Sequence, residues 1–500
     1  MPIHRSLRSL PLLSGLGLLL GGCSFIPPYL LPKFDTPAAY REAVAPAQAE
    51  LPWKVAASDA VPEAPWQLFD LPELPELLSR LEAANASLAV AQGRYQQAAA
   101  LIDQASAGLF PAVNGNAATS RAHNSGSAAA STTTTTSFGL AASWEIDLWG
   151  RLRATVEADE ASARASAADL AGVRLALQAQ LVQSLLALRI VEVQRDLLDA
   201  TVADYERYLQ LTADRIRFGV ASRADLAQAE SQLRSAQAQA VETGVQRALL
   251  EHAIAVLVGE LPASFRLPLR PADDSGLRAQ LRGLGDKVPP GSGTTHASIF
   301  DRVPAVPTAP LSAPSTLLER RPDIAAAERR AAAANAGVGV ARAAFFPVLS
   351  LSGTAGQRST ALSDILTAPA RFWSIGPSLV APLFDAGLHS AQKAQAVAVW
   401  DQATATYRQT VLSAFQEVED QLSTLRILAD EARIQEAAVR AARVSAELTQ
   451  AQYRAGVASS LQVIVANSAL LAAERSALDL HNRRLTAAVV LIRAMGGGWS

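Results

Sequence analysis

The chain has few of the residues that carry most enzyme chemistry. Its 500 residues include one cysteine and six histidines. A single cysteine excludes an internal disulfide, and the histidines, at positions 4, 123, 252, 296, 389 and 481, form no metal-ligand spacing. There is no P-loop and no G-x-S-x-G nucleophile elbow. The sequence therefore argues against an enzyme and indicates no metal or other bound cofactor.

The chain also lacks an excess of charge of one sign, and it lacks a long hydrophobic run after its N-terminus. Its 44 basic and 46 acidic residues are interspersed. Nothing in this distribution matches the basic stripe of a nucleic-acid-binding surface, so nucleic acid is not an expected partner. Beyond residue 22 no uninterrupted apolar run reaches 18 residues, so we predict no membrane-spanning helix in the mature chain.

Proline and glycine are nearly absent from two runs of 68 residues, 151–218 and 388–455. Neither run contains proline, and the only glycine in either is Gly172. Each run can form one continuous helix about 100 Å long. Both runs end in the pattern Arg-X-Gly-Val-Ala-Ser, which comprises Arg217, Gly219, Val220, Ala221 and Ser222 in the first run and Arg454, Gly456, Val457, Ala458 and Ser459 in the second.

Other short motifs recur at nearly the same spacing. Phe110-Pro111 recurs as Phe346-Pro347, and Leu148-Trp149 recurs as Leu383-Phe384, with offsets of 235 to 237 residues. Each half reads as a short helix, two strands, the long helix, the Gly-Val-Ala-Ser turn and a further helix, at 224–258 and 461–495. A period of this length predicts a tandem duplication of a domain-sized unit.

The N-terminus has the pattern of a secretory signal. Basic residues precede a largely apolar stretch at 10–20 that is too short to span a membrane convincingly. Leu20-Gly21-Gly22-Cys23 resembles the lipobox of bacterial lipoproteins, in which a diacylglycerol is attached to the cysteine before cleavage. Ser24 stands where an aspartate would favour retention at the inner membrane, so the resemblance implies the outer membrane. The alternative is a chance cysteine after an ordinary signal peptide.

The predicted organisation follows from the signal and the duplication. Short helices at 76–107 and 316–344 begin the repeats, near Asn85 and near Arg321-Pro322-Asp323. Residues 270–314 are rich in proline and glycine and predict a linker with one short ordered element. The predicted domains are a signal peptide at 1–22, a lipid-anchored segment at 23–75, a first repeat at 76–269, a linker or equatorial segment at 270–315 and a second repeat at 316–496.

Two pairs of strands are predicted between the helices. Residues 138–148 alternate, with apolar side chains at even positions and small or polar side chains at most odd positions, and 373–383 alternate similarly. Weaker partner strands are expected at 112–120 and 348–356, with polar loops at 121–137 and 357–371. Such strands are typical of a transmembrane β-barrel, although two soluble hairpins remain an alternative. Four strands cannot close a barrel, so a membrane-spanning role requires several chains.

The second long helix carries a heptad pattern typical of coiled-coil packing. Its apolar positions alternate in steps of four and three, at Val411, Phe415, Val418, Leu422, Leu425, Ala429 and Ala432. The acidic residues Glu417, Glu419 and Asp420 lie between these positions, and we interpret them as a solvated face. The pattern alone does not distinguish a hollow tube from a two-chain rod.

The lipobox, the duplicated order of elements, the stretch Leu318-Glu319-Arg320-Arg321-Pro322-Asp323-Ile324 and the repeated turn together resemble the TolC/OprM family of outer-membrane efflux ducts. The resemblance covers nearly all of the mature chain. It implies a mainly α-helical protein with a membrane β-barrel, in which a homotrimer forms a 12-stranded barrel from four strands per chain and a coiled-coil tunnel of long helices. Implied partners are the outer membrane, a periplasmic adaptor and an inner-membrane efflux transporter, with drugs or other small molecules as cargo. The lipid on Cys23 would be an accessory anchor.

The resemblance also implies a role for the repeated turns. In the family they lie at the periplasmic tip of the tunnel, where the adaptor docks, so Gly219, Val220, Ala221, Ser222 and their counterparts Gly456, Val457, Ala458, Ser459 would form docking sites. For the gate, it implies Asp225 in the first repeat, with Arg217, Arg223 or Tyr453 as partners, and Leu461 as an apolar constriction. Gln462 and Val465 depart from the acidic residues that members often have. The alternatives are two plain helix corners, and for Asp225 a carboxylate that favours the helix dipole.

Two other classes of protein fit the sequence less well. Gly337-Val338-Gly339 matches part of a dinucleotide-binding fingerprint, but no third glycine follows and the surroundings are alanine-rich, so we treat the match as chance. A periplasmic adaptor or a non-channel coiled-coil lipoprotein could also carry a lipobox and long helices. The two strand pairs argue against this class, because an adaptor would carry a lipoyl-like β domain and a single helical hairpin.

Overall fold

The computed structural model describes residues 26–29, 36–43, 53–55, 65–125, 131–269, 303–311 and 314–497. The predicted signal peptide, Cys23 and most of the linker at 270–315 lie outside these residues, so those predictions stay untested. The chain divides into two compact units. One contains residues 92–170 and 323–410 together with the N-terminal residues up to 34, and the other contains 35–91, 171–322 and 411–500.

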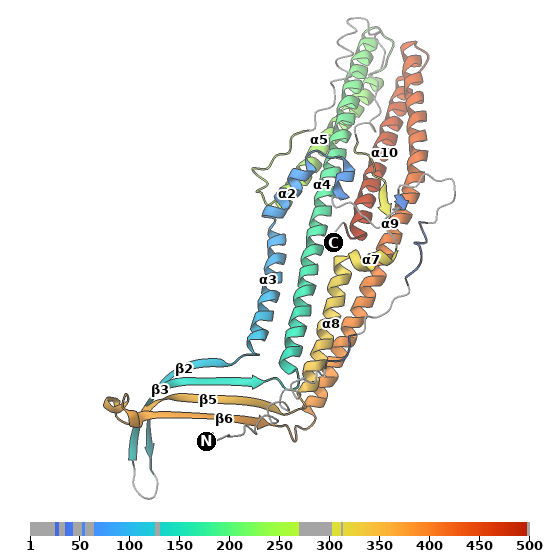
Figure 1. Ribbon diagram of the computed structural model, residues 1–500. Coiled ribbons are helices and arrows are strands. Elements are labelled where there is room, and N and C mark those ends of the chain that lie inside the picture. The colour runs from blue at the N-terminus through green and yellow to red at the C-terminus, as the bar shows by residue number, and fades with distance from the viewer. Residues whose placement is uncertain are drawn as a thin grey trace, which may run out of the picture. The chain divides into compact units, whose positions relative to one another are not determined.

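The two long helices form as predicted. Helix α4 is Arg151–Arg217 and helix α9 is Leu388–Arg454, with 67 residues each. Each is followed, after a short turn, by a 35-residue helix, α5 (Arg223–Leu257) or α10 (Ser460–Ala494), which runs back beside it (Figure 1). The boundaries agree with the prediction to one residue. The runs contain no proline and no turn sequence in their interior, so nothing in them breaks the helix.

The short helices differ from the prediction, because each is broken in two. The first breaks into α2 (Leu74–Ala84) and α3 (Ala86–Ala107), and the second into α7 (Pro314–Arg320) and α8 (Pro322–Ala343). At the first break the Asn85 Oδ1 accepts from the backbone N–H of Leu88 and its Nδ2 donates to the Leu257 carbonyl, at 2.8 Å. Asn85 therefore starts a new helix instead of lying inside one.

Four strands form one antiparallel sheet in the order β2-β3-β5-β6. Their bounds are Ala112–Asn124, Ser131–Ile146, Val348–Ser359 and Arg371–Val380. The strand pairs are confirmed, but they extend into the predicted loops. Residues 132–136 are a run of threonines in β3 rather than a loop, because β-branched side chains favour the extended backbone. Short 3-10 turns at Leu362–Asp364 and Ala368–Ala370 connect β5 to β6.

The pleat gives the sheet an apolar face and a small, polar face. Trp144 of β3 lies opposite Leu351 of β5, which lies opposite Pro377 of β6. One step along, Ser143 lies opposite Ser352. Directly opposed residues point to the same face, so the predicted alternation of the strands continues across the whole sheet. This is the pattern of strands with lipid on one side and water on the other.

A second, small sheet lies in the other unit. Strand β1 (Trp53–Val55) pairs in parallel with β4 (Ala309–Leu311), which is the short ordered element expected in the linker. Just before β4, the Pro304 carbonyl lies 2.8 Å from Nε2 of His481 on α10. Burial lowers the pKa of His481, so the neutral ring donates this hydrogen bond at neutral pH.

The helical core is built on the heptad positions. Val411, Val418 and Leu422 of α9 are fully buried.

In α4 one 18-residue window reaches a mean hydropathy of 1.2, which contradicts the expectation that no helix could span a membrane. The expectation rested on unbroken apolar runs, whereas this window contains polar but few charged residues. Leu181 and Leu185 of α4 are fully buried in the protein, and a core helix meets the same criterion.

The interpretation of Glu417 and Glu419 as a solvated face is wrong. Glu417 forms ion pairs with Arg321, at 2.8 Å, and with Arg493. The Glu419 carboxylate accepts from the backbone N–H groups of Arg41, at 2.7 Å, and of Glu42. Both residues therefore hold other segments of the chain against α9. Sequence alone could not show this, because the partners are distant in the chain.

Candidate functional site

The two repeated turns close the helix pairs with the same backbone geometry. Gly219 and Gly456 have φ values of +74° and +78°, which a residue with a side chain rarely adopts. In the first turn the Val220 N–H donates to the Arg215 carbonyl at 2.8 Å, and in the second the Val457 N–H donates to the Gln452 carbonyl at 2.9 Å. These bonds satisfy the last carbonyls of α4 and α9, as in a Schellman motif.

The serine of each turn caps the following helix. Ser222 Oγ accepts from the N–H of Asp225, and the Asp225 carboxylate accepts from the N–H of Ser222 at 2.9 Å. Ser459 and Gln462 repeat the same capping box at the start of α10. Aspartate and glutamine can both complete such a box, so the departure at Gln462 preserves the local fold while removing a charge.

Asp225 also links the two turns. Ser460 Oγ, in the first residue of α10 after the second turn, donates a hydrogen bond to the Asp225 carboxylate. That bond, and then the bonds from Ser222, lower the pKa of Asp225. Beneath it, the Arg215 guanidinium lies 3.9 Å from the Tyr453 ring centroid and donates to the Tyr453 carbonyl at 2.7 Å. The two turns are thereby held together by side chains from both repeats.

The predicted gate residues fall into two groups. Leu461 and Val465, one helical turn apart on α10, are 57% and 59% exposed, and Gln462 is exposed as well. Tyr453 is only 3% exposed and packs on Tyr208, with ring centroids 5.5 Å apart. Tyr453 therefore does not present its ring at the surface of the tip within this chain. The prediction that Tyr453 belongs to the gate stays a prediction.

The predicted partners of Asp225 are not the ones it contacts within the described chain. Arg217 pairs instead with Asp214, at 3.2 Å, and Tyr453 is held by Arg215. In the two repeated turns Val220 and Val457 are exposed. Apolar side chains at an exposed turn are available to a partner protein.

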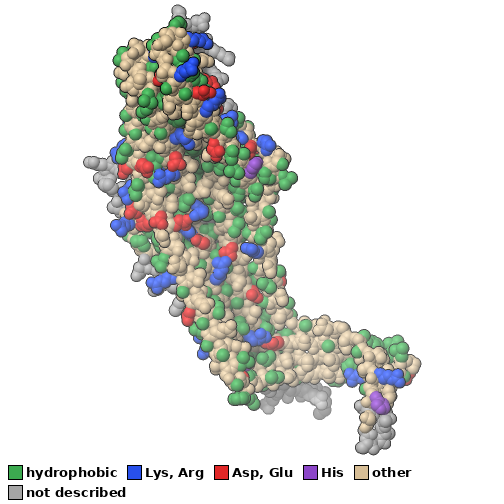
Figure 2. All heavy atoms as spheres, turned by 180° about the vertical axis from the view of Figure 1, so that it is seen from behind, with side chains coloured by type: hydrophobic (Ala, Val, Ile, Leu, Met, Phe, Trp, Pro, Cys, Tyr) green, Lys and Arg blue, Asp and Glu red, His purple; other side chains and the backbone are tan. Residues whose placement is uncertain are grey.

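The sheet forms the second part of the site. Its strands contain few charged residues, and each of these lies within four residues of a strand end: Arg121, Glu145, Arg358 and Arg371. On the face seen in Figure 2, charged side chains of both signs are spread over the helices, and few lie along the sheet between its ends. Strands without charges in their central part can be placed in hydrocarbon at low cost.

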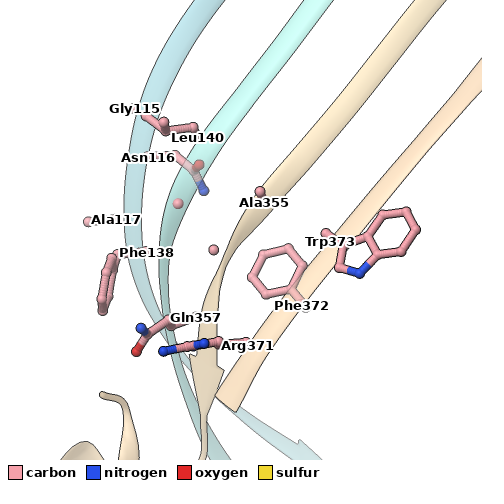
Figure 3. A pocket seen from close by; sticks show the side chains of 12 residues that line it. Gly115, Asn116, Ala117, Phe138, Leu140, Ala355, Gln357, Arg371, Phe372 and Trp373 are labelled. Carbon is pink, nitrogen blue, oxygen red and sulfur yellow. The ribbon is translucent and has the colours of Figure 1, made fainter. Parts of the chain in front are cut away.

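Two glycines lie opposite each other on neighbouring strands near the middle of the sheet, a pair that we call the glycine crossing. Gly139 of β3 lies directly opposite Gly356 of β5. A Cβ atom added to Gly356 would lie 2.4 Å from the carbonyl oxygen of Phe138, and one added to Gly139 would lie 2.6 Å from that of Ala355. A hollow of about 770 Å³ borders this crossing (Figure 3). The aromatic rings of Phe138, Phe372 and Trp373 line it.

Below the tip, a buried ion-pair network was not anticipated from the sequence. Arg189 of α4 binds Glu73 at 2.7 Å and Glu192 at 2.6 Å, and Arg247 of α5 binds Glu192 and Glu251, each at 3.2 Å. All these side chains are buried or nearly so. The spacing of Arg189 to Glu192 and of Arg247 to Glu251 matches helical ion pairs, which was the one available signal.

The long paired helices, the repeated turns and the amphipathic sheet define an outer-membrane efflux channel, in which a helical tunnel continues into a β-barrel. Residues 77–260 and 313–497 match the outer membrane efflux protein family, and the chain belongs to this family. It is 31% identical over 507 residues to the pyoverdine export outer membrane protein OpmQ of Pseudomonas aeruginosa, with 99% of this chain and 98% of that protein covered. It is also 27% identical over 483 residues to the cation efflux system protein CusC of Escherichia coli, with 96% and 97% covered.

Solved structures agree with this assignment. The chain matches the outer-membrane channel OprN with a TM-score of 0.80 and 29% identity, covering 94% of this chain and 99% of that one. It matches the open state of the MtrE outer membrane channel of Neisseria gonorrhoeae with a TM-score of 0.78 and 26% identity, covering 95% and 98%. The protein is thus the outer-membrane component of an efflux pump.

Proposed function

We propose that the protein is a homotrimeric exit duct, anchored by a lipid on Cys23, that receives small molecules from a periplasmic adaptor and an inner-membrane efflux transporter. Its relatives are named for the export of pyoverdine, toluene, antibiotics or cations, so we propose a passage that does not itself select one cargo. The observation that carries the proposal is the open sheet. Edges β2 and β6 are unpaired among the described strands, and an unpaired edge is not tolerated in hydrocarbon.

The duplication indicates how another copy would cover these edges. Within the chain, β3 of the first repeat pairs with β5 of the second, and Trp149 of the first repeat stacks on Phe346 of the second at 5.0 Å. The equivalent contact from the second repeat back to the first would join Phe384 to Phe110. Phe384 is 91% exposed and Phe110 is 69% exposed. We propose that this second contact forms between neighbouring copies, with β6 beside β2.

Replacing Phe384 by alanine is therefore expected to lower the yield of oligomer and to leave the fold of each chain intact. Leu366→Ala is the matched control, because Leu366 is also largely exposed but lies in the turn between β5 and β6. The measurement is native mass in detergent, together with circular dichroism. An F384A protein that keeps its full oligomer at concentrations where the control does would contradict the proposed neighbour contact.

At the tip, we propose that Leu461 from each copy forms an apolar constriction and that the turns of residues 219–222 and 456–459 receive the adaptor. Leu461 and Val465 expose an apolar stripe beside the capped start of α10, where no partner within the described chain covers it. Hydrophobic constrictions close a pore by excluding water, so a polar substitution should open it.

Single-channel conductance in planar bilayers tests this proposal. Leu461→Ser is expected to raise the conductance several-fold above that of the unmodified protein, whereas Leu249→Ser should not change it. Leu249 has a similar exposed fraction, 63%, but lies on α5, 27 positions after Ser222 at the end of the turn. A verified oligomer that conducts nothing in either form would favour a non-channel coiled-coil lipoprotein, and equal conductance of both variants would remove Leu461 from the gate.

A further inference from the structure

The small, polar face of the sheet carries a single aromatic side chain among the described strands. Ser352 lies on this face, and steps of two along β5 place Gly356 and Arg358 there as well. Phe372 of β6 lies directly opposite Gly356, so it shares the face. At the other positions of this face the four strands carry small, hydroxyl or amide side chains, except for valines and a glutamate at the end nearest the helices.

The Phe372 ring lies against the glycine crossing, and the Arg358 guanidinium lies over the ring. A Cβ atom added to Gly356 would be 3.1 Å from Cε1 of Phe372, so the ring lies this close because Gly356 has no side chain. In Figure 3 the ring lies between β5 and β6. Cζ of Arg358 is 4.8 Å from the ring centroid. A guanidinium above an aromatic face is held in place and can still donate hydrogen bonds from its edge.

Arg358 gives the polar face a positive charge that no described side chain neutralises. Glu145, at the opposite end of the strands, is paired with Arg151 at 2.8 Å. Arg358 is exposed, and among the described residues no carboxylate lies within ion-pair distance of it. Arg371, the other arginine at this end of the sheet, lies opposite Gln357 and therefore on the apolar face. The two faces thus carry separate arginines at the end away from the helices.

Arg358 also lines a hollow of about 460 Å³ at this end of the sheet. Three further lining residues carry hydroxyl groups, Thr135, Ser359 and Thr360. Guanidinium and hydroxyl groups both donate hydrogen bonds to a carboxylate or another anion. Asp364 lines the hollow too, and its carboxylate accepts from Ser363 Oγ at 2.9 Å. Its negative charge opposes an anion there, so Arg358 is the group on which binding depends.

We infer that Arg358, stacked on Phe372, forms with the hydroxyl-lined hollow an anion site on the water-facing wall of the barrel, near the mouth away from the helices, and that this site favours the exit of cargo with a carboxylate or another anionic group. This inference rests on the trimeric barrel proposed above. A barrel of twelve strands, about 4.8 Å apart and tilted by about 40°, has a backbone radius of about 12 Å. The Debye length is about 10 Å at 0.1 M salt, so three such sites would act across most of the passage.

A cysteine on the polar face tests the site. Ser374 is exposed and lies on this face, two residues or about 7 Å along β6 from Phe372. In the Ser374→Cys oligomer, the rates of modification by an anionic and by a cationic methanethiosulfonate reagent are measured by mass spectrometry. Cys23 carries the lipid in the proposed protein, and the chain without Ser374→Cys gives the background.

Arg358→Gln should lower the ratio of the anionic to the cationic rate about two-fold at about 0.1 M salt, where screening keeps the effect local. Arg371→Gln is the matched control, because it removes the same charge at the same end from the opposite face, and it should lower the ratio less. Phe372→Leu keeps the charge but removes the ring that holds it, so its effect should fall between these two. Native mass confirms the oligomer of each variant. Equal ratios in R358Q and R371Q would overturn the anion site.

Ile375→Cys separates this inference from the barrel on which it rests. Ile375 follows Ser374 but lies on the apolar face, where it is 68% exposed. In lipid nanodiscs, Ser374→Cys should react with both charged reagents and Ile375→Cys with neither. Equal modification at both positions, or none at 374 in a verified oligomer, would overturn the barrel and the anion site with it. Modification at 374 alone, with a ratio that R358Q leaves unchanged, would overturn the anion site and leave the barrel in place.

Discussion

Replacing Glu192 by alanine is expected to lower the free energy of unfolding by about 3–5 kcal/mol, the cost typical of breaking a buried ion pair by removing one partner. Glu192 lies between two arginines, with Arg189 at 2.6 Å and Arg247 at 3.2 Å. Its removal would leave two buried guanidinium groups with one carboxylate each. The measurement is the loss of helical circular dichroism on heating the detergent-purified protein, where E192A should melt well below the unmodified chain.

The size of this effect follows from how the network is enclosed. Burial alone would lower the pKa of Arg189, but the hydrogen bonds and charges of Glu192 and Glu73 outweigh it and raise that pKa. The network also holds backbone groups, because Arg247 donates to the Leu267 carbonyl at 2.8 Å. Losing Glu192 would therefore loosen the segment that follows α5 as well as the contact between helices.

Two variants separate charge from shape. Glu192→Gln keeps an acceptor of the same size, so its cost should be smaller than that of E192A. Glu230→Ala removes one partner of an exposed helical pair with Arg234 and should cost less than about 1 kcal/mol. If E192A and E230A melted at the same temperature, the buried network would contribute no more to the free energy of unfolding than an exposed ion pair does.

The duplication does not preserve this network. At an offset of 237 residues, Arg247 corresponds to Arg484, but Glu192 and Glu251 correspond to Ala429 and Ala488. Arg484 Nε is buried without a hydrogen-bond partner among the described residues, and burial lowers the pKa of Arg484. The two halves therefore share a backbone plan while their ion pairs have diverged. Aligning the two repeats shows which positions carry a charge in one half and not in the other. It does not show which charged side chains form ion pairs with each other.

The sequence predicts the elements of this fold better than their contacts. Helices α4 and α9 could be predicted to one residue because the absence of proline and the closing glycines act locally. The strand ends could not, because the polar composition of residues 132–136 suggested a loop while pairing with β2 extends the strand. Pairing across the sheet outweighs local preference at such positions.

The candidate site shows the same limit. The capping boxes at Ser222 and Ser459 follow from residues three positions apart and can be read locally. The bond from Ser460 to Asp225 joins residues 235 positions apart, and the buried place of Tyr453 depends on Tyr208 in the other repeat. Glu419 was misread for the same reason, because its partners, the N–H groups of Arg41 and Glu42, lie more than 370 residues away.

Gly356→Ala is expected to destabilise the barrel strands by about 1–3 kcal/mol, the usual cost of forcing an extra methyl into a packed site. The added Cβ would lie 2.4 Å from the Phe138 carbonyl oxygen and 2.7 Å from Cα of Gly139. Both atoms belong to the backbone of β3, so no side chain can rotate away. The two strands would have to separate where their hydrogen bonds hold them together.

Gly353→Ala is the matched control on the same strand. Its added Cβ would meet the Ser374 carbonyl oxygen at 3.7 Å, an ordinary contact, so both variants share the loss of backbone freedom and differ in the clash. The measurement is the heating temperature at which the detergent-purified oligomer dissociates in gels, where G356A should fall clearly below G353A. Equal dissociation temperatures for the two variants would mean that β3 and β5 do not approach this closely in the assembled barrel. The paired glycines would then provide backbone flexibility rather than close packing.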